Sequence, residues 1–225
     1  MDDKKQRIII GLTGGIASGK SEVRKILESM GFFGIDADQI SHEIMQNGSP
    51  VFHAIVARFG KKILDLPDDP EHASISRTHL SELVFSDKEA LQWLESVSHP
   101  YIIARIKALI EQTDQSIVIE AIKLMTTDLA TLCGQKWFIV TDEETQIHRL
   151  VEKRGLSYQS AQLRVAAQNS IVWNLEEFDA IIHANVPLPE LRSKVIFLLE
   201  KYNASLHPDD SQNVSAIRNL DQSSE

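Results

Sequence analysis

The chain has 225 residues, of which 43% are hydrophobic and 24% charged, a balance typical of a globular protein with a full apolar core. Its net charge of −9 argues against a surface that coats nucleic acid, because such surfaces are strongly basic. The single cysteine excludes an intrachain disulfide, and no run approaches the roughly 20 apolar residues of a membrane span. We therefore expect one main domain in the reducing cytoplasm, with neither a nucleic-acid nor a membrane partner.

The first predicted element is a buried strand at residues 7–10, followed by a glycine-rich turn and a helix over residues 22–30. The turn has the spacing Gly-x-x-x-x-Gly-Lys-Ser, in which backbone N–H groups wrap around phosphate oxygens. Glycine supplies the backbone freedom, the lysine neutralises phosphate charge, and the serine hydroxyl suits Mg²⁺. The residues predicted to bind the nucleotide are Gly14, Gly15, Ile16, Ala17, Ser18, Gly19, Lys20 and Ser21. A nucleoside triphosphate is the expected ligand; a chance match at a glycine turn is the alternative.

A second strand is predicted at residues 32–35, and it ends at Asp36-Ala37-Asp38. Open α/β sheets bind ligands at the carboxyl ends of their strands, so Asp36 is a candidate for chemistry. Asp36 could also cap the helix predicted over residues 37–46, which is compatible with that role. Asp38 fits a cap or a supporting partner better.

Residues 51–113 have an apolar pattern that is mostly helical, and we interpret them as an insertion between strands. Helices are predicted at residues 51–59, 78–85, 88–97 and 101–110. His99-Pro100 is expected to open the last of them, because proline suits the first position of a helix.

Further buried strands are predicted at residues 116–120, 136–140 and 180–183, and the first ends in Glu120. Strands alternating with helices predict an α/β fold with a mainly parallel sheet. Thr141-x-x-Glu144 has the spacing of a capping box at the start of a helix. A closing helix is expected over residues 187–202, followed by a disordered polar tail at 203–225.

Two short helices, at residues 142–153 and 158–168, carry Arg149, Arg154 and Arg164. Guanidinium groups pair bidentately with phosphate oxygens, so the two helices could form a lid over the nucleotide. A solvated basic face explains the same residues equally well.

Three segments together resemble the dephospho-coenzyme A kinase family: Gly11 to Ser21, Ile35-Asp36-Ala37-Asp38, and His99-Pro100-Tyr101-Ile102. The stretch from Arg149 to Gln168 extends the likeness, which covers about residues 7–202. The phosphate loop alone would fit many nucleotide-binding proteins, whereas its combination with these two further motifs is specific.

The resemblance implies a phosphate-loop kinase fold over residues 1–202, with a helical acceptor-binding insertion at about 37–113 and a lid at about 143–170. It implies transfer of the γ-phosphoryl group of ATP, with Mg²⁺, to the ribose 3′-hydroxyl of dephospho-coenzyme A. Asp36 would orient the hydroxyl and accept its proton, Ser21 would hold the metal, and Asn185 would lie near the adenine. Lys20, Arg149, Arg154 and Arg164 would neutralise the phosphates.

Four features depart from the family pattern: Ile103 stands where the family often has arginine, Asn174 replaces an expected lysine, and two segments differ. Glu120 to Leu124 keeps a carboxylate but loses the residues that usually follow it, and His183 to Val186 lacks the usual glycine turn. These changes leave two alternatives open: a kinase acting on another small molecule such as a nucleoside monophosphate, and a nucleotide-binding protein without turnover.

Overall fold

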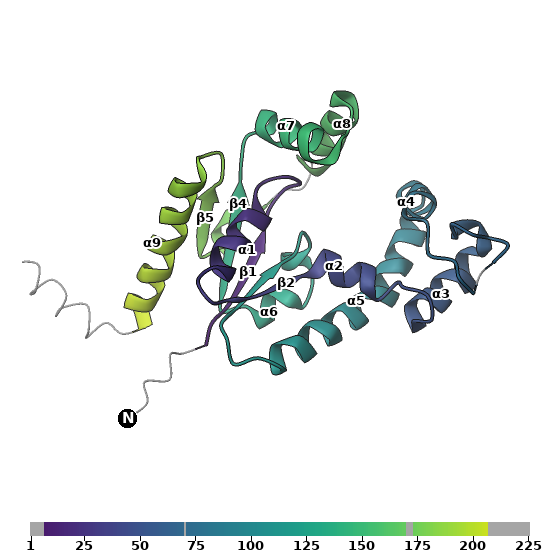
Figure 1. Cartoon of the computed structure of the whole chain (residues 1–225), viewed down its shortest axis with the longest axis horizontal. Helices are drawn as coiled ribbons and strands as arrows, with labels where there is room; N and C mark the ends of the chain where they lie inside the picture. Colours follow the sequence, from purple (N-terminus) through teal and green to yellow (C-terminus); the bar gives the residue numbers. More distant parts are fainter. Residues whose placement is uncertain (1–6, 70, 170–172, 207–225) are drawn as a thin grey trace, which may run out of the picture.

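The computed structural model describes residues 7–69, 71–169 and 173–206, and it contains a five-stranded sheet with helices on both faces (Figure 1). The strand order is β2-β3-β1-β4-β5, and every neighbouring pair is parallel. The predicted α/β fold is therefore confirmed. The strands are β1 (Ile9–Thr13), β2 (Phe33–Asp36), β3 (Ile117–Glu120), β4 (Gln135–Val140) and β5 (Ala180–His183).

The sheet is buried on both faces, which explains why its strands are continuous apolar runs. One core joins alternate residues of the strands, such as Ile10 and Leu12, to α1 (Lys20–Glu28) and α9 (Leu188–Leu206). The other core joins the intervening residues, such as Ile117 and Ile119, to α2 (Ala37–Glu43), α5 (Lys88–Glu111) and α6 (Leu129–Leu132). Because the strands are parallel, their carboxyl ends meet at one edge of the sheet.

The chain between β2 and β3 is helical, and part of it extends away from the sheet (Figure 1). Besides α2 and α5 it contains α3 (Pro50–Phe59), α4 (Arg77–Ser86) and the 3₁₀ helix η1 (Lys61–Ile63). These elements have an apolar cluster of their own, which includes Val51, Ile55 and Leu94.

The helix α5 runs without a break through Pro100, so the prediction that this proline opens a new helix is wrong. Proline inside a helix removes one backbone hydrogen bond and normally kinks or breaks it. Here Leu94 packs in the cluster of the insertion and Ile106 packs under the sheet. Apolar burial on both sides of the proline offsets the lost hydrogen bond.

Above the carboxyl edge of the sheet lie α7 (Glu143–Arg154) and α8 (Tyr158–Asn169) (Figure 1). The N-cap of α7 is Asp142, whose carboxylate accepts a hydrogen bond from the Thr145 N–H, so the predicted capping box at Thr141 is wrong. Aspartate competes as a cap because its ionised side chain also meets the positive end of the helix dipole. Gly155 ends the helix in the left-handed conformation (φ 65°), as its sequence position predicts.

The closing helix α9 continues to Leu206, so the start of the predicted disordered tail is helical instead. Its apolar face packs in the core with α1 through Leu191, Val195 and Leu199, and the last turn of the helix continues past the expected end with exposed residues. The rest of the predicted tail, residues 207–225, lies outside the described part of the chain. Among the helices of the described residues, none combines the length and apolar character that a membrane crossing needs.

Two 3₁₀ helices complete the description. They are η2 (Leu124–Thr126), after β3, and η3 (Leu175–Glu177), before β5.

Candidate active site

The phosphate loop joins β1 to α1, and its backbone adopts conformations that explain its glycines. Gly14 has φ 145°, and a Cβ there would lie 2.1 Å from the carbonyl oxygen of Ile139, so no larger residue fits. Gly19 has φ 109° and forms the N-cap of α1. Ala17 also has positive φ, at 53°, which a non-glycine residue rarely adopts. Strain of this kind marks functional sites and must be held in place by neighbouring groups.

Gly15 has a different reason to be glycine from the one that the sequence suggested. Its φ is not positive. Instead, a Cβ at this position would lie 2.7 Å from the side-chain nitrogen Nε2 of Gln146. The missing side chain therefore makes room for a residue of α7 to reach the loop.

Three side chains of α7 and α8 bind the loop at adjacent residues. Gln146 Nε2 donates to the Ile16 carbonyl oxygen at 2.9 Å, and Gln168 Oε1 accepts from the Ile16 N–H. Arg149 donates to the Ala17 carbonyl oxygen at 3.0 Å and to the Ala184 carbonyl oxygen at 2.7 Å. The side chains of Ile16 and Ala17 also pack in the apolar cluster of the two helices. The pair α7–α8, which we call the lid, is thus joined to the phosphate loop directly.

Lys20 is buried, with 6% of its surface exposed, and its ammonium group donates to the carbonyl oxygens of Gly14 and Gly15 at 3.0 and 2.9 Å. Burial lowers the pKa of Lys20, while the carboxylates of Glu120 and Asp38 oppose that shift. The ammonium group therefore lies inside the loop, with carboxylates around it.

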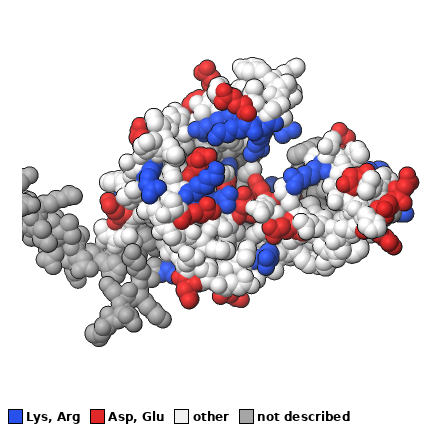
Figure 2. Space-filling view, viewed as in Figure 1, with Lys and Arg blue, Asp and Glu red and all other residues white. Residues whose placement is uncertain are grey.

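The other predicted lid arginines are exposed on their helices. Arg154, at the end of α7, is close enough to Lys20 and Asp38 for its charge to act on the pKa of both. Arg164 lies on α8, and within the described residues it makes no hydrogen bond or ion pair. Figure 2 shows basic side chains lining a hollow between the lid and the insertion, with acidic groups interspersed.

Two carboxylates stand at adjacent strand ends, because Asp36 of β2 is in register with Glu120 of β3. Asp36 caps α2: its Oδ1 accepts from the backbone N–H groups of Asp38 and Gln39, each at 3.0 Å. Its Oδ2 takes no part in the cap. Glu120 is buried, and its Oε1 accepts from the Ser21 hydroxyl at 2.9 Å.

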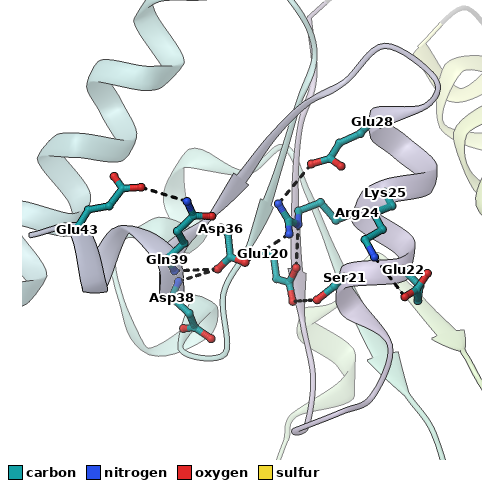
Figure 3. A network of polar contacts seen from close by, with 10 residues as sticks. All are labelled: Ser21, Glu22, Arg24, Lys25, Glu28, Asp36, Asp38, Gln39, Glu43 and Glu120. Atoms are coloured by element: carbon teal, nitrogen blue, oxygen red, sulfur yellow. Dashed lines mark hydrogen bonds and ion pairs between the residues drawn. The ribbon is translucent and has the colours of Figure 1, made fainter. Parts of the chain in front are cut away.

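Arg24 connects these groups, and the sequence reasoning missed it (Figure 3). Its Nε donates to Glu120 Oε2 at 3.0 Å, and its Nη2 lies 3.4 Å from Asp36 Oδ2. Its Nη1 pairs with Glu28 of the same helix at 3.3 Å. The available signal was spacing: Arg24 follows Ser21 by three residues, so both point from one face of α1.

Burial raises the pKa of Glu120, and the hydrogen bond from Ser21 and the charge of Lys20 oppose that shift. The pKa of Asp38 is raised as well, because surrounding groups remove part of its hydration and Asp36 adds a like charge. On α2, desolvation and the charge of Arg77 lower the pKa of His42. Several carboxylates and basic groups therefore lie close together at this edge of the sheet.

The predicted metal site fits Mg²⁺ in its donor atoms. The Ser21 hydroxyl and the Glu120 carboxylate are hard oxygen ligands 2.9 Å apart beside the phosphate loop. Within the described residues no group of three or more His, Cys, Asp or Glu side chains could hold a metal.

A cavity of about 240 Å³ opens on the other side of Gly19, and Arg149, Lys153, Ala184 and Val186 line part of it. Asn185, predicted near the adenine, is absent from the lining; its amide donates to Asp142 Oδ2 at 3.2 Å.

A family model described as dephospho-CoA kinase matches residues 8–190. The chain belongs to the dephospho-coenzyme A kinase family. A dephospho-CoA kinase from Carboxydothermus hydrogenoformans is 34% identical over 86% of this chain and 94% of its own length. One from Geobacter metallireducens is 40% identical over 72% of this chain and 80% of its own length.

Solved structures agree with this family. Dephospho-CoA kinase from Campylobacter jejuni is 27% identical, with a TM-score of 0.54 over 87% of this chain and 97% of its own. The protein TT1252 from Thermus thermophilus has a TM-score of 0.71 over 88% of this chain and 98% of its own. At 24% identity, this similarity indicates a shared fold and nothing more. Shikimate kinase from Acinetobacter baumannii shares the fold at 14% identity, with a TM-score of 0.50 over 88% and 96% of the two chains.

The segment that departs from the family pattern, Glu120 to Leu124, is tied into the structure at several points. The Thr13 hydroxyl donates to the Ile122 carbonyl oxygen at 3.0 Å. Lys123 forms an ion pair with Glu95 of α5, which connects the sheet edge to the insertion. In this member of the dephospho-coenzyme A kinase family, the segment is thus anchored both to β1 and to α5.

Proposed function

We propose that this protein transfers the γ-phosphoryl group of ATP to the ribose 3′-hydroxyl of dephospho-coenzyme A, giving coenzyme A and ADP. The observation that carries the proposal is the position of Asp36: a carboxylate with one oxygen outside its helix cap lies at the same edge of the sheet as the phosphate loop. Family membership supplies the identity of the acceptor.

The phosphate loop would bind the triphosphate through its backbone N–H groups and the dipole of α1. Lys20, which donates to loop carbonyl oxygens here, needs only to turn its ammonium group toward the phosphates. Arg149 and Arg154, and Arg164 if the lid moves closer, would add charge from the other side. Phosphoryl transfer depends on such positioning and neutralisation more than on covalent chemistry.

Ser21, and Glu120 directly or through water, would hold Mg²⁺, which neutralises charge on the β- and γ-phosphates. The adenine is proposed to occupy the cavity beside Gly19 and Arg149. Asn185, whose amide binds Asp142, is not among the residues that line this cavity, although its chain neighbours Ala184 and Val186 are.

Asp36 Oδ2 is the proposed proton acceptor. The acceptor's O3′ forms a bond to the γ-phosphorus as the bond from that phosphorus to the ADP oxygen breaks, and the hydroxyl proton passes to Asp36. Oδ1 remains fixed by two backbone N–H groups, so the carboxylate keeps its orientation while Oδ2 takes the proton.

The helices α2–α5 are proposed to bind the acceptor and the lid to exclude water, with the core, insertion and lid forming one domain over about residues 1–202. We also propose a reducing, cytoplasmic location, which the single cysteine of the sequence, Cys133, supports.

The test incubates the purified chain with ATP, Mg²⁺ and dephospho-coenzyme A and follows coenzyme A by chromatography. Lys20→Ala is the inactive control, and Lys25→Ala, an exposed lysine of the same helix, is the matched control that should retain activity. No product above the Lys20→Ala background would refute the proposal. A preference for a nucleoside monophosphate in the same assay would favour the alternative kinase instead.

A further inference from the structure

We infer that Arg24 is a positioning residue for phosphoryl transfer, which holds Asp36 and Glu120 in their relative orientation and neutralises them as a pair. This inference rests on the proposed function and adds a residue to it. Three carboxylates converge on this one guanidinium from α1, β2 and β3 (Figure 3).

Arg24 contacts one oxygen of Glu120 and one oxygen of Asp36, and the other oxygen of each carboxylate is held by a different group. Glu120 uses Oε2 for Arg24 and Oε1 for the Ser21 hydroxyl. Asp36 uses Oδ1 for the helix cap and directs Oδ2 toward Arg24. The distance from Arg24 to Asp36 Oδ2 is 3.4 Å, longer than the 3.0 Å from Arg24 to Glu120 Oε2. Because that contact is long, Oδ2 can still accept a proton while its direction is fixed.

Only a planar, forked cation reaches both groups in this way. The Nε and Nη2 atoms of one guanidinium point to two different carboxylates at neighbouring strand ends. A lysine in the same place would bring a point charge with no fixed fork. Arg24 is half-buried in this arrangement, with 19% of its side chain exposed, so solvent screens its charge only in part.

Charge balance gives Arg24 a second effect. The groups around Asp36 are Arg24 and Lys20 from α1, Glu120 from β3, Asp38 and His42 from α2, and Arg154 of the lid near Asp38. Without Arg24, the carboxylates of Asp36 and Glu120 would lie side by side with no cation between them. Their repulsion would push Asp36 out of line just where an anionic triphosphate must approach.

The test compares Arg24→Met, which keeps the length but removes charge and fork, with Arg24→Lys. The control is Lys25→Met, which removes a positive charge from the next residue of α1, where 63% of the side chain is exposed. Each variant is assayed for kcat, for ATP binding by calorimetry without acceptor, and for melting temperature.

We expect Arg24→Met to lower kcat about 10- to 100-fold, the size of effect that small misplacement of a reacting group produces. ATP binding should stay within about twofold of wild type, Arg24→Lys should recover part of kcat, and Lys25→Met should match wild type. Combining Arg24→Met with Glu120→Gln should give less than the product of the separate losses, because both act on one network.

Four results would overturn the inference. The first two are wild-type kcat in Arg24→Met and a loss of kcat in Lys25→Met equal to that in Arg24→Met. The other two are a loss of kcat that only parallels the losses of ATP binding and melting temperature, and wild-type kcat in Arg24→Lys. The last result decides the question if Arg24→Met does not fold. If the wild-type chain itself makes no coenzyme A, the proposed function fails first and this inference fails with it, so the two failures are distinguishable.

Discussion

Replacing Gln146 with methionine tests whether the lid holds the phosphate loop in its binding conformation. Gln146 is 7% exposed and donates to the Ile16 carbonyl oxygen at 2.9 Å. Methionine has nearly the same length and packs in apolar surroundings, but it cannot donate a hydrogen bond. The variant therefore leaves one carbonyl oxygen unpaired at the turn of the loop.

The size of the effect follows from the loss of that partner. Because Ile16 is only half-buried, losing this hydrogen bond costs about 0.5–1.5 kcal/mol, which corresponds to roughly a 2- to 13-fold change in an equilibrium constant. The cost falls on the loop conformation in which Ala17 has positive φ. A smaller population of that conformation weakens ATP binding in proportion. We expect the dissociation constant for ATP to rise within this range.

The assay is calorimetric titration with a non-hydrolysable ATP analogue. Gln162→Met is the matched control, because Gln162 lies on the exposed side of α8 in the same lid. Binding by Gln146→Met within twofold of wild type would refute the reasoning, as would an equal loss in Gln162→Met.

Three further predictions use the same structure. Gly14→Ala should abolish ATP binding, because its Cβ would lie 2.1 Å from a backbone oxygen. Gly48 lies in open space at φ 84°, so Gly48→Ala should cost only about 1–2 kcal/mol of unfolding free energy. Equal effects of the two variants on ATP binding, measured by calorimetry, would contradict this. Desolvation raises the pKa of the half-buried Cys133 to about 12, so a disulfide reagent at pH 8 should label the native thiol far more slowly than the unfolded one. Equal labelling rates would contradict this. Hydrogen bonds from Thr145 hold the pKa of Asp142 below its usual value, so its cap stabilises the fold fully above about pH 4 and less as the pH falls further. The variant Asp142→Asn cannot titrate at this position, so it should flatten the decline in melting temperature between about pH 5 and 3. Identical slopes for the variant and the wild type would contradict the assignment.

The sequence predicted the sheet well because its strands are short, apolar and bounded by helices. It also placed Asp36 and Glu120 at the ends of buried strands, and parallel strands bring such ends together. Both inferences depend on local pattern and on a general rule of topology, and neither needs contacts between distant side chains.

Other features depend on contacts between side chains that are distant in sequence, and these features were not predicted. Arg24 looks like a solvated helix residue until β2 and β3 place carboxylates beside it. Gln146 carries no signal of its role until α7 lies against the loop. The break predicted at Pro100 failed because burial on both sides outweighed a local rule. The predicted roles of Arg164 and Asn185 stay predictions.

The helix α5 has a consequence for how the molecule unfolds. Its first half belongs to the apolar cluster of the insertion, and its second half belongs to the cluster under the sheet. The insertion would otherwise be a candidate for melting on its own, as small peripheral units often do. Because one 24-residue helix is shared between the two clusters, loss of either removes packing from the other. The insertion and the sheet should therefore unfold as one cooperative unit.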